Sequence, residues 1–485
     1  MKLTHTIAAV VAIAAFTSAA PQGEISEQVR LMKHKDKTPG FEPGVGHFSE
    51  WSRQTKKEFL IDWQSGKMAD WTLVQGNEGG DLDSMAAALT WAYHLEHSTM
   101  NTSKPTRAIA LLQTPEDALD LRPENKVALD NSKMSSAHAD LLTIDELPED
   151  PETLSRKIRG IVLVDHPTPI RKWNNARILS ILDHHADRGI APDAEPRIFE
   201  KVASCTTLVA RQMLDELEAL PQEYHMPHEL LELVLSAIAI DSKGLKEGKA
   251  TETDREVAKR VLKRSAWRKR DLEDVMEDLE DELSDAKDDI DHLGLRDLLR
   301  RDWKGDLVVS SLSQTLSRPP TQPTQHMVTQ LTSSPQDTPS PTTPTVKIGF
   351  ASVPYSMDTQ IAKTEFAAIF DWFAIEAAWT AEIRTDISIT LTKYKTRTHK
   401  GKKQKIREIV LVVRDNVRID EAQADSLFKT VSEAIEKNRG LNVERWHKAD
   451  QLRSRQMVWV QGRESSAGRK VVRPLVEKAV EAWDM

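Results

Sequence analysis

The chain has 485 residues, which is long enough for two domains with separate hydrophobic cores. Its 75 acidic residues outnumber its 66 basic residues, and the net charge of -9 excludes an overall positive field that would draw the protein to nucleic acid or an anionic membrane. A single cysteine, Cys205, excludes an internal disulfide.

The N-terminal residues have the pattern of a secretory signal peptide. Lys2 is followed by the apolar run Ile7–Phe16 and then by small residues up to Ala19. We therefore predict a signal peptide over residues 1–19 and a secreted or vacuolar protein, with a cytoplasmic protein as the alternative. The apolar run is too short to span a bilayer. Residues 20–46, which Gly and Pro interrupt, are predicted to be a flexible lead.

Short β-type runs alternate with helical patterns over residues 47–264. The runs are WTLVQGN, RAIALLQ, GIVLVDH, RILSILDHH and RIFEKVAS. Such alternation is typical of a parallel sheet whose two faces are covered by helices. The sequence therefore predicts an α/β domain with a mainly parallel sheet.

The second half of the chain begins with a strongly acidic segment over residues 265–294. Its leucines and Met276 recur at helical spacing, which predicts a solvated helix that bridges two domains. Residues 295–485 are predicted to form a second, smaller α/β domain across a cleft, with a hairpin from DISITLTKYK to KIREIVLVV and a final helix at RPLVEKAVEAW. Within this domain, residues 314–345 are rich in Pro, Thr, Ser and Gln, which predicts a disordered insertion.

Polar side chains gather at four places, each directly after an apolar run that we interpret as a strand. They are Asn77, Asp81 and Asp83; Asp165; His184 and His185; and Asp241. Ligands of open parallel sheets bind at the carboxyl ends of the strands, so we expect these side chains to converge. Carboxylates, an amide oxygen and imidazoles can together hold two hard divalent cations. Helix capping explains single aspartates, but not four linked motifs in order.

The four motifs resemble the DHH superfamily of phosphoesterases, and most closely its exopolyphosphatase branch. That branch is related to the prune proteins and to family II inorganic pyrophosphatases, which have His where this chain has Asn77. The similarity continues through ASCTTLV, DSKGLKEGKATETD and LRDLLRRDWK to SAGRKVVRPL. The last stretch is similar to the Arg-Lys signature of the DHH-associated C-terminal domain. The resemblance implies a DHH phosphoesterase domain over 47–264 and a DHH-associated domain over 295–485.

The resemblance also implies roles for individual residues. The implied metal ligands are Asn77, Asp81, Asp83, Asp165, His184 and Asp241. They would hold two divalent cations, Mn²⁺ or Mg²⁺ with Co²⁺ as a further candidate, and Asp165 and Asp241 would be shared between the ions. The implied catalytic residues are His185, Asp165 and Asp83, with His185 facing the phosphate. The implied substrate-binding cations are Lys249, Arg296, Arg300, Arg301, Arg469 and Lys470.

The activity that this resemblance implies is metal-dependent hydrolysis of phosphoric anhydrides. The leading hypothesis is an exopolyphosphatase that releases orthophosphate from the end of linear polyphosphate by two-metal hydroxide attack. The alternatives are a pyrophosphatase or nucleotide phosphodiesterase of the same family, and a non-catalytic phosphate-binding scaffold. The basic stretch Lys395–Lys405 fits either the steering of polyphosphate or a solvated hairpin loop. The sequence leaves the preferred metal, the substrate chain length and the oligomeric state open, and it predicts neither a nucleic-acid partner nor a membrane span.

The signal peptide can be tested on protein purified from the native source. We expect N-terminal sequencing to begin at Ala20, because a small residue precedes the expected cleavage site. A mature chain that still begins at Met1 or Lys2 would contradict the secretory assignment.

Overall fold

The computed structural model describes residues 47–98, 106–135, 137–220, 223–310, 345–397, 403–462 and 467–483. The signal peptide, the flexible lead and the Pro/Thr-rich insertion up to residue 344 lie outside the described residues and stay predictions. Among the helices that are described, none combines the length and the apolar character needed to cross a bilayer.

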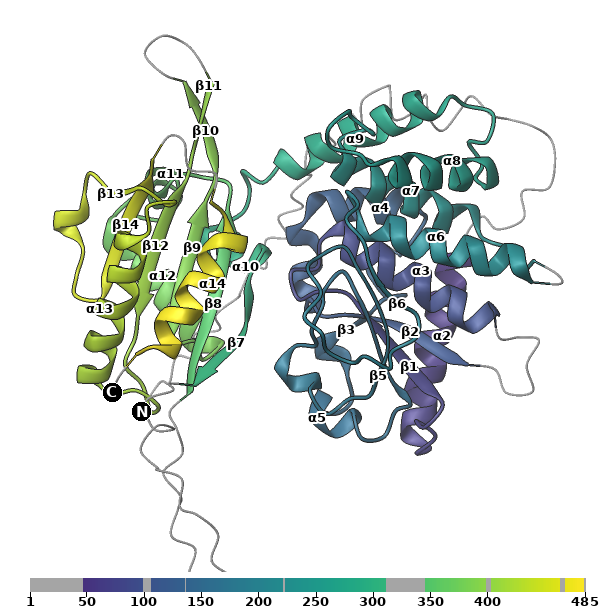
Figure 1. Ribbon diagram of the computed structural model, residues 1–485, viewed down its shortest axis with the longest axis horizontal. Helices are drawn as coiled ribbons and strands as arrows, with labels where there is room; N and C mark the ends of the chain where they lie inside the picture. The colour runs from purple at the N-terminus through teal and green to yellow at the C-terminus, as the bar shows by residue number, and fades with distance from the viewer. Residues whose placement is uncertain are drawn as a thin grey trace, which may run out of the picture. The chain divides into compact units, whose positions relative to one another are not determined.

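A six-stranded sheet in which every pair of neighbours is parallel forms the centre of the first half (Figure 1). Its strands are β1 (Trp71–Gln75), β2 (Arg107–Leu112), β3 (Leu142–Thr143), β4 (Gly160–Val164), β5 (Ile178–Asp183) and β6 (Arg197–Phe199), in the order β3-β2-β1-β4-β5-β6. The predicted parallel α/β sheet is thus confirmed, with the addition of the short edge strand β3. Because the chain leaves β1 toward one edge and returns to β4 on the other side, the carboxyl ends of β1 and β4 flank a topological switch point.

Side chains of each strand alternate between two hydrophobic cores. In β4, Ile161 and Leu163 belong to one core, while Val162 and Val164 belong to the other. Successive residues of a strand point to opposite faces, so a sheet covered on both faces needs an uninterrupted apolar run. This requirement explains why the strand segments could be recognised in the sequence.

Helices cover both faces of this sheet. The larger core includes side chains of α3 (Leu82–Ser98), α4 (Pro123–Asn131), α6 (Cys205–Ala219), α7 (His228–Ser242), α8 (Glu252–Arg264) and α9 (Leu272–Asp288). The opposite core includes side chains of α2 (His47–Gln64) and α5 (Pro151–Leu154). The short helices η1 (Glu116–Leu121), η2 (Ile144–Glu146) and η3 (Arg171–Trp173) lie in the connections.

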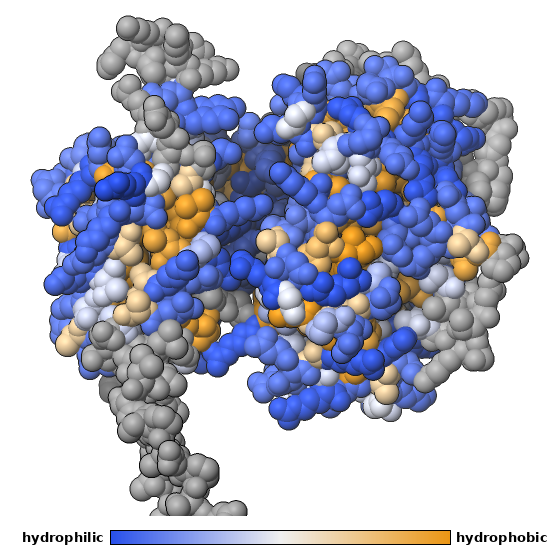
Figure 2. Space-filling model, viewed as in Figure 1, coloured by the Kyte–Doolittle hydropathy of each residue, from blue (hydrophilic) through white to orange (hydrophobic). Residues whose placement is uncertain are grey.

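Helix α9 corrects the prediction of a solvated bridging helix. The acidic segment is helical as expected, but Val275, Met276, Leu279 and Leu283 are at most 1% exposed and belong to the larger core of the first domain. The outward side of the helices in this region is hydrophilic in Figure 2. The acidic residues therefore form the solvated face of an amphipathic helix that packs against α4 and α7, and α9 is part of the domain rather than a linker.

The apolar run before Asp241 is not the strand that its sequence indicates. It is the helix α7, and Asp241 lies in its last turn. Every residue from Leu233 to Ile240 is buried, so the run has no polar face whose spacing would distinguish a helix from a strand. Asp241 therefore reaches the site from a helix end and not from a strand end.

The second half contains a mixed six-stranded sheet in the order β13-β14-β12-β9-β8-β7. Its strands are β7 (Lys304–Ser310), β8 (Thr345–Val353), β9 (Ile387–Thr392), β12 (Glu408–Val413), β13 (Val443–Arg445) and β14 (Gln456–Gln461). Only β8 and β9 pair in parallel; the other neighbours are antiparallel. The predicted hairpin is confirmed, because β9 and β12 are antiparallel and are joined through a two-stranded extension of β10 (Tyr394–Arg397) and β11 (Lys403–Ile406).

Helices cover both faces of the second sheet as well. One core includes α13 (Glu421–Lys437) and α14 (Arg469–Glu481), and the other includes α10 (Leu295–Arg301), α11 (Met357–Ala362) and α12 (Ile369–Glu382). The short helix η4 (Ala449–Gln451) follows β13. Ala118 and Leu121 of η1 belong to the core that contains α10, so the segment that connects the two sheets is anchored to the first domain.

The role of α9 in the first core can be tested by truncating Leu279. We expect Leu279→Ala to lower the free energy of unfolding by about 2–5 kcal/mol, because it leaves a cavity in a packed core. The exposed Glu277→Ala, two residues earlier on the same helix, should change it by less than about 0.5 kcal/mol. Urea unfolding measures both variants, and equal effects would contradict the packing of α9 into the core.

Candidate metal centre

Asn77 and Asp165 lie directly after β1 and β4, at the switch point of the parallel sheet. The Asn77 side-chain amide donates to Asp165 Oδ2 at 2.7 Å, and the hydroxyl of Ser84 donates to the same oxygen at 2.6 Å. Asp165 has a φ of 62°, in the left-handed region that residues with a side chain seldom adopt. Its backbone N–H donates to the carbonyl of Leu182 in the neighbouring strand at 3.1 Å. The sheet therefore holds the Asp165 carboxylate in a defined place.

His184 and His185 approach Asp165 from the end of β5. Nε2 of His184 lies 3.3 Å from Asp165 Oδ1, and Nδ1 of His185 lies 3.8 Å from it. One ligand atom from each of these three residues lies within 4.8 Å of the other two. The Nδ1 hydrogen of His184 faces the carbonyl of Val202 at 3.2 Å, which leaves Nε2 available for a cation. The two rings meet at 79°, so they present different edges to the site.

Asp183, which ends β5, is a buried partner of His185. Its side chain is fully buried, and its Oδ1 accepts a hydrogen bond from His185 Nδ1 at 2.8 Å. Oδ2 is also buried, with no hydrogen-bond donor among the residues that the structure describes. An aspartate in this position fixes the orientation of the imidazole and leaves its Nε2 free.

Asp81 and Asp83 lie at the start of α3. Asp81 caps this helix, because its Oδ1 accepts the backbone N–H of Ser84 at 3.2 Å. Asp83 is 3% exposed and accepts backbone N–H groups of Cys205 and Thr206, at 2.7 and 2.8 Å, and the hydroxyl of Ser204 at 2.6 Å. The N-terminus of α6 therefore holds Asp83 in place, and a helix N-terminus favours negative charge there.

The charges of this cluster are strongly coupled. Burial disfavours charge on Asp165, but the hydrogen bond and charge of His184 outweigh it and lower the pKa of Asp165 to about 2. Burial also disfavours a charged His184, yet Asp165 and Asp83 raise its pKa to about 10. Desolvation and the charge of Asp165 raise the pKa of Asp83 to about 6. At neutral pH the cluster therefore holds a proton on His184, close to several carboxylates.

These residues fit a divalent metal. Buried carboxylate oxygens and an imidazole nitrogen are ligands that Mn²⁺ and Mg²⁺ accept. The pKa of His184 is raised by the neighbouring carboxylates, and the buried Oδ2 of Asp183 has no hydrogen-bond donor among the described residues. Both observations indicate that the carboxylates of this cluster carry negative charge that a bound cation would balance. Asp241, in the last turn of α7, adds a further carboxylate beside Asp81 and Asp83 in the same cavity.

A cavity of about 340 Å³ lies beside the cluster. Three of the predicted metal ligands line it, namely Asp81, Asp83 and Asp241. Two of the predicted substrate-binding cations, Arg301 and Arg469, line it as well. The other charged residues of the wall are Arg122, Glu124, Lys287, Asp302 and Lys393. The cavity thus brings carboxylates and cations to one space, which suits a metal-bound anion.

Asp302 connects the cations of this cavity. Its carboxylate accepts two hydrogen bonds from Arg469, at 3.1 and 3.2 Å, and one from the buried Arg122 at 3.4 Å. Arg122 also donates to the carbonyl of Gly79, in the loop that carries Asn77, at 2.9 Å. Burial would raise the pKa of Asp302, but Arg469, Arg122 and Lys304 lower it. The loop after β1 is therefore tied through Arg122 and Asp302 to the start of α14.

The structure does not bring all of the predicted substrate-binding cations to this cavity. Arg296 pairs with Glu382 at 2.8 Å, and Arg300 pairs with Asp117. Lys249 and Lys470 are exposed and are not among the residues that line the cavity. Arg301 instead pairs with the buried Glu124 at 3.2 Å, inside the cavity wall.

Sequence reasoning missed several residues of the site. They are Ser84, Arg122, Lys287, Asp302 and Lys393. Ser84 directly follows Asp83, and Asp302 directly follows Arg301. Asp183 precedes His184 in the same motif, and the structure pairs it with His185. Arg122 carried no signal, because an isolated Arg before a Pro is ordinary in a surface connection. Its burial and its bonds to Gly79 and Asp302 distinguish it.

Comparison with known proteins agrees with this geometry. Residues 71–238 match the model of the DHH family, N-terminal domain. This part of the chain is therefore similar to the DHH domain. The resemblance seen in the sequence motifs is confirmed, and the match spans the strands and helices that carry Asn77, Asp81, Asp83, Asp165, His184 and His185.

Three curated relatives resemble the region around the DHH domain. A protein of Schizosaccharomyces pombe named "Putative exopolyphosphatase" is 32% identical over 219 residues, which are 43% of this chain and 55% of that protein. The manganese-dependent inorganic pyrophosphatase of Bacillus subtilis is 25% identical over 39% of this chain and 53% of its own length. Exopolyphosphatase PRUNE1 of Rattus norvegicus is 30% identical over 48% of each chain. The matches thus span about half the length of these relatives.

Metal binding should release a proton from His184. The pKa of His184 is raised to about 10, so the metal-free protein is protonated there at neutral pH, and a cation at Nε2 must displace that proton. We expect the affinity for Mn²⁺ to rise by about tenfold per pH unit between about pH 7 and 8. Below about pH 6, protonation of Asp83 should weaken binding further.

Isothermal titration calorimetry with Mn²⁺, in buffers that differ in ionisation enthalpy, counts the released protons. The variant His184→Asn should bind Mn²⁺ more weakly and release one proton fewer than the parent at neutral pH. The same proton count in this variant and in the parent would contradict the assignment of His184.

Proposed function

We propose that this protein is a metal-dependent phosphohydrolase that releases orthophosphate from the end of linear polyphosphate. The observation that carries the proposal is the cavity, which Asp81, Asp83 and Asp241 line together with Arg122, Arg301 and Arg469. Acidic ligands can hold divalent cations, and guanidinium groups match phosphate oxygens in charge and geometry. Relatives named exopolyphosphatase and manganese-dependent inorganic pyrophosphatase support the same reaction class.

In this proposal the six predicted ligands hold two cations, Mn²⁺ or Mg²⁺. They are Asn77, Asp81, Asp83, Asp165, His184 and Asp241. When bound, the cations supply Lewis acidity and lower the pKa of the attacking water. Asp165 is the ligand shared between them, because it lies at the centre of the cluster and Ser84 and Asn77 orient its carboxylate.

Side chains of the protein bind the substrate and neutralise its negative charge. Arg122, Arg301 and Arg469 neutralise phosphate oxygens, and each guanidinium has donors beyond those that Asp302 and Glu124 accept. His185, oriented by Asp183, is placed to hydrogen-bond the phosphate that leaves. Preorganised donors of this kind stabilise the charge that develops in the transition state and need no reorganisation.

A pyrophosphatase is the second candidate, because the metal cluster itself does not distinguish a short anhydride from a long one. The pyrophosphatase of Bacillus subtilis matches over a similar part of this chain. A phosphate-binding scaffold without activity is the third alternative. The buried carboxylates of Asp83 and Asp165 argue against it, since burying them without a catalytic or metal-binding role would be costly.

A side-by-side assay tests the reaction class and the substrate. Phosphate release is measured from long polyphosphate, tripolyphosphate and pyrophosphate with Mn²⁺, Mg²⁺ or Co²⁺. We expect the highest kcat/KM on long polyphosphate. Release from pyrophosphate alone would support the pyrophosphatase alternative, and no release from any substrate with any of the metals would contradict the proposal.

The variant Asp165→Asn tests the shared ligand. It keeps the size of the side chain but removes one charge between the two proposed ions, so we expect kcat to fall by about 10³-fold, or about 4 kcal/mol. Circular dichroism should show an intact fold. The control Asp193→Asn, at an exposed position in the same domain, should keep the activity of the parent. Activity of Asp165→Asn within a few-fold of the parent would contradict the two-metal mechanism.

A further inference from the structure

A second cavity of about 370 Å³ adjoins the first one. The two share Pro354 and Lys393 in their walls. The second cavity is lined in addition by Asp288, Ile290, Asp291, Tyr355, Tyr394, Lys395 and Lys405. Its three lysines are Lys393, directly before β10, Lys395 in β10 and Lys405 in β11, so the cavity lies at the base of the β10–β11 hairpin. Figure 1 shows this hairpin extending beyond the sheet.

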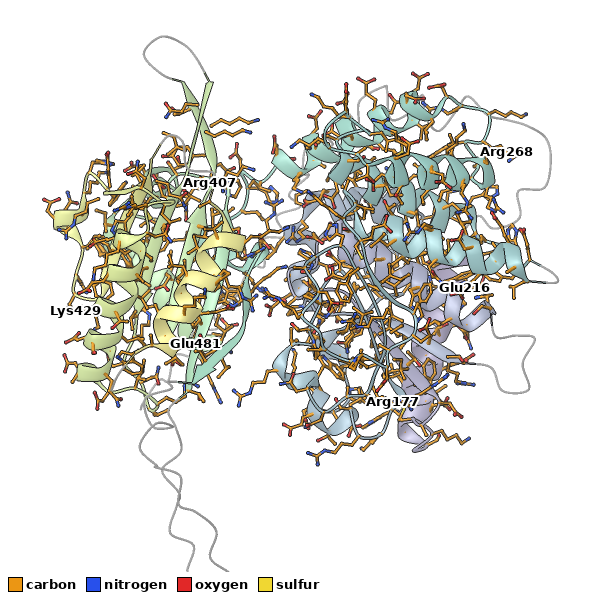
Figure 3. All side chains as sticks on the ribbon, in the orientation of Figure 1. Arg177, Glu216, Arg268, Arg407, Lys429 and Glu481 are labelled. Carbon is orange, nitrogen blue, oxygen red and sulfur yellow. The ribbon has the colours of Figure 1, made fainter. Side chains whose placement is uncertain are left out.

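Positive charge is crowded at the base of this hairpin. The antiparallel register places Lys395 directly opposite Lys405, and like charges in directly opposed positions destabilise a strand pair. Desolvation lowers the pKa of Lys393, and the charges of Arg407, Lys405, Lys249 and Lys395 lower it further. Arg407, labelled in Figure 3, lies between β11 and β12. The lysines therefore repel one another in the absence of an anion.

These lysines lack acidic partners in the described part of the chain. No carboxylate there lies within ion-pair distance of Lys393, Lys395 or Lys405. The acidic residues of the second cavity do not fill this role. The Asp291 carboxylate accepts the hydroxyl of Tyr355 at 2.5 Å and lies 3.7 Å from Lys363. A bound anion would supply the missing negative charge.

The aromatic residues of the cavity disfavour a nucleic acid as that anion. Lys363 lies 5.0 Å above the ring of Tyr355, so one face of this ring is covered by a cation. The hydroxyl of Tyr394 is held by Glu408 at 2.9 Å. Single-stranded nucleic acids are commonly bound by bases stacked on open aromatic faces. The cavity offers crowded ammonium groups instead, which suit a polyanion without bases.

We propose that the second cavity, with Lys393, Lys395 and Lys405 in its wall, binds the distal phosphates of a linear polyphosphate whose terminal phosphate occupies the first cavity. Lys393 joins the two subsites, because it lines both cavities. The inference rests on the proposed function and adds a binding subsite for the distal part of the substrate. Long chains contact both cavities, whereas pyrophosphate contacts only the first, so the hairpin lysines select for chain length.

The double variant Lys395→Gln/Lys405→Gln tests this subsite in the full chain. The KM for long polyphosphate should rise about tenfold, because two charge-assisted phosphate contacts are lost, while the kcat/KM for pyrophosphate or tripolyphosphate stays within about twofold. The rise of KM with salt should also become less steep for long chains. The matched control Lys429→Gln/Lys437→Gln removes the same charge from exposed positions on α13 and should resemble the parent.

Direct binding separates failure of this inference from failure of the proposed function. Fluorescently labelled long polyphosphate is titrated into the parent, the hairpin variant and the α13 control, without requiring turnover. Weaker binding by the hairpin variant alone supports the subsite even if no substrate is hydrolysed. Equal binding by all three proteins overturns it, even if polyphosphate is hydrolysed. Binding of single-stranded RNA as tight as that of polyphosphate, with the same loss in the hairpin variant, would also overturn it.

Discussion

Buried negative charge at the carboxyl ends of the parallel strands is the constraint on which the rest of the site depends. Asp83, Asp165 and Asp183 are each at most 3% exposed, and apolar packing cannot compensate a desolvated carboxylate. The chain compensates two of them with donors: Ser84 and Asn77 for Asp165, and the N-terminus of α6 for Asp83. The protonated His184 adds positive charge beside these carboxylates. A divalent cation bound at its Nε2 would balance their negative charge more strongly.

A second charged centre, Asp302, extends this arrangement to the C-terminal half. Asp302 accepts donors from Arg122, which also holds the loop after β1, and from Arg469 at the start of α14. The segment before it is anchored because α10 packs against η1 and α12. Arg122 and Arg469, from distant parts of the sequence, are therefore held in the wall of the first cavity by one carboxylate, whose position depends on the packing of α10.

The two cavities differ in how their charges are balanced. In the first, the cations Arg122, Arg301 and Arg469 have acidic partners, so an anion there must share donors with Asp302 and Glu124. In the second, Lys395 and Lys405 face each other without a carboxylate partner in the described residues. Paired guanidinium groups impose a fixed geometry on an anion, whereas solvated lysines act as point charges. The two cavities therefore suit a polyanion whose reactive end is held in one position and whose remaining length is only attracted.

Local sequence alone determined most of the elements and the centre of the candidate metal site. Continuous apolar runs identify β1, β2, β4 and β5, and the carboxyl ends of parallel strands share one edge, so Asp165, His184 and His185 could be expected to meet. Tertiary packing decided the rest. The apolar run of α7 is buried throughout, so it has no polar face whose spacing would distinguish a helix from a strand. The leucines of α9 belong to the core only because the helix packs against α4 and α7, which the sequence does not show. Arg300 and Arg301 are adjacent and chemically identical, yet one pairs with Asp117 and the other with Glu124 in the cavity wall. One residue rotates a side chain by about 100° around a helix, and only the packing of α10 determines which direction faces the site.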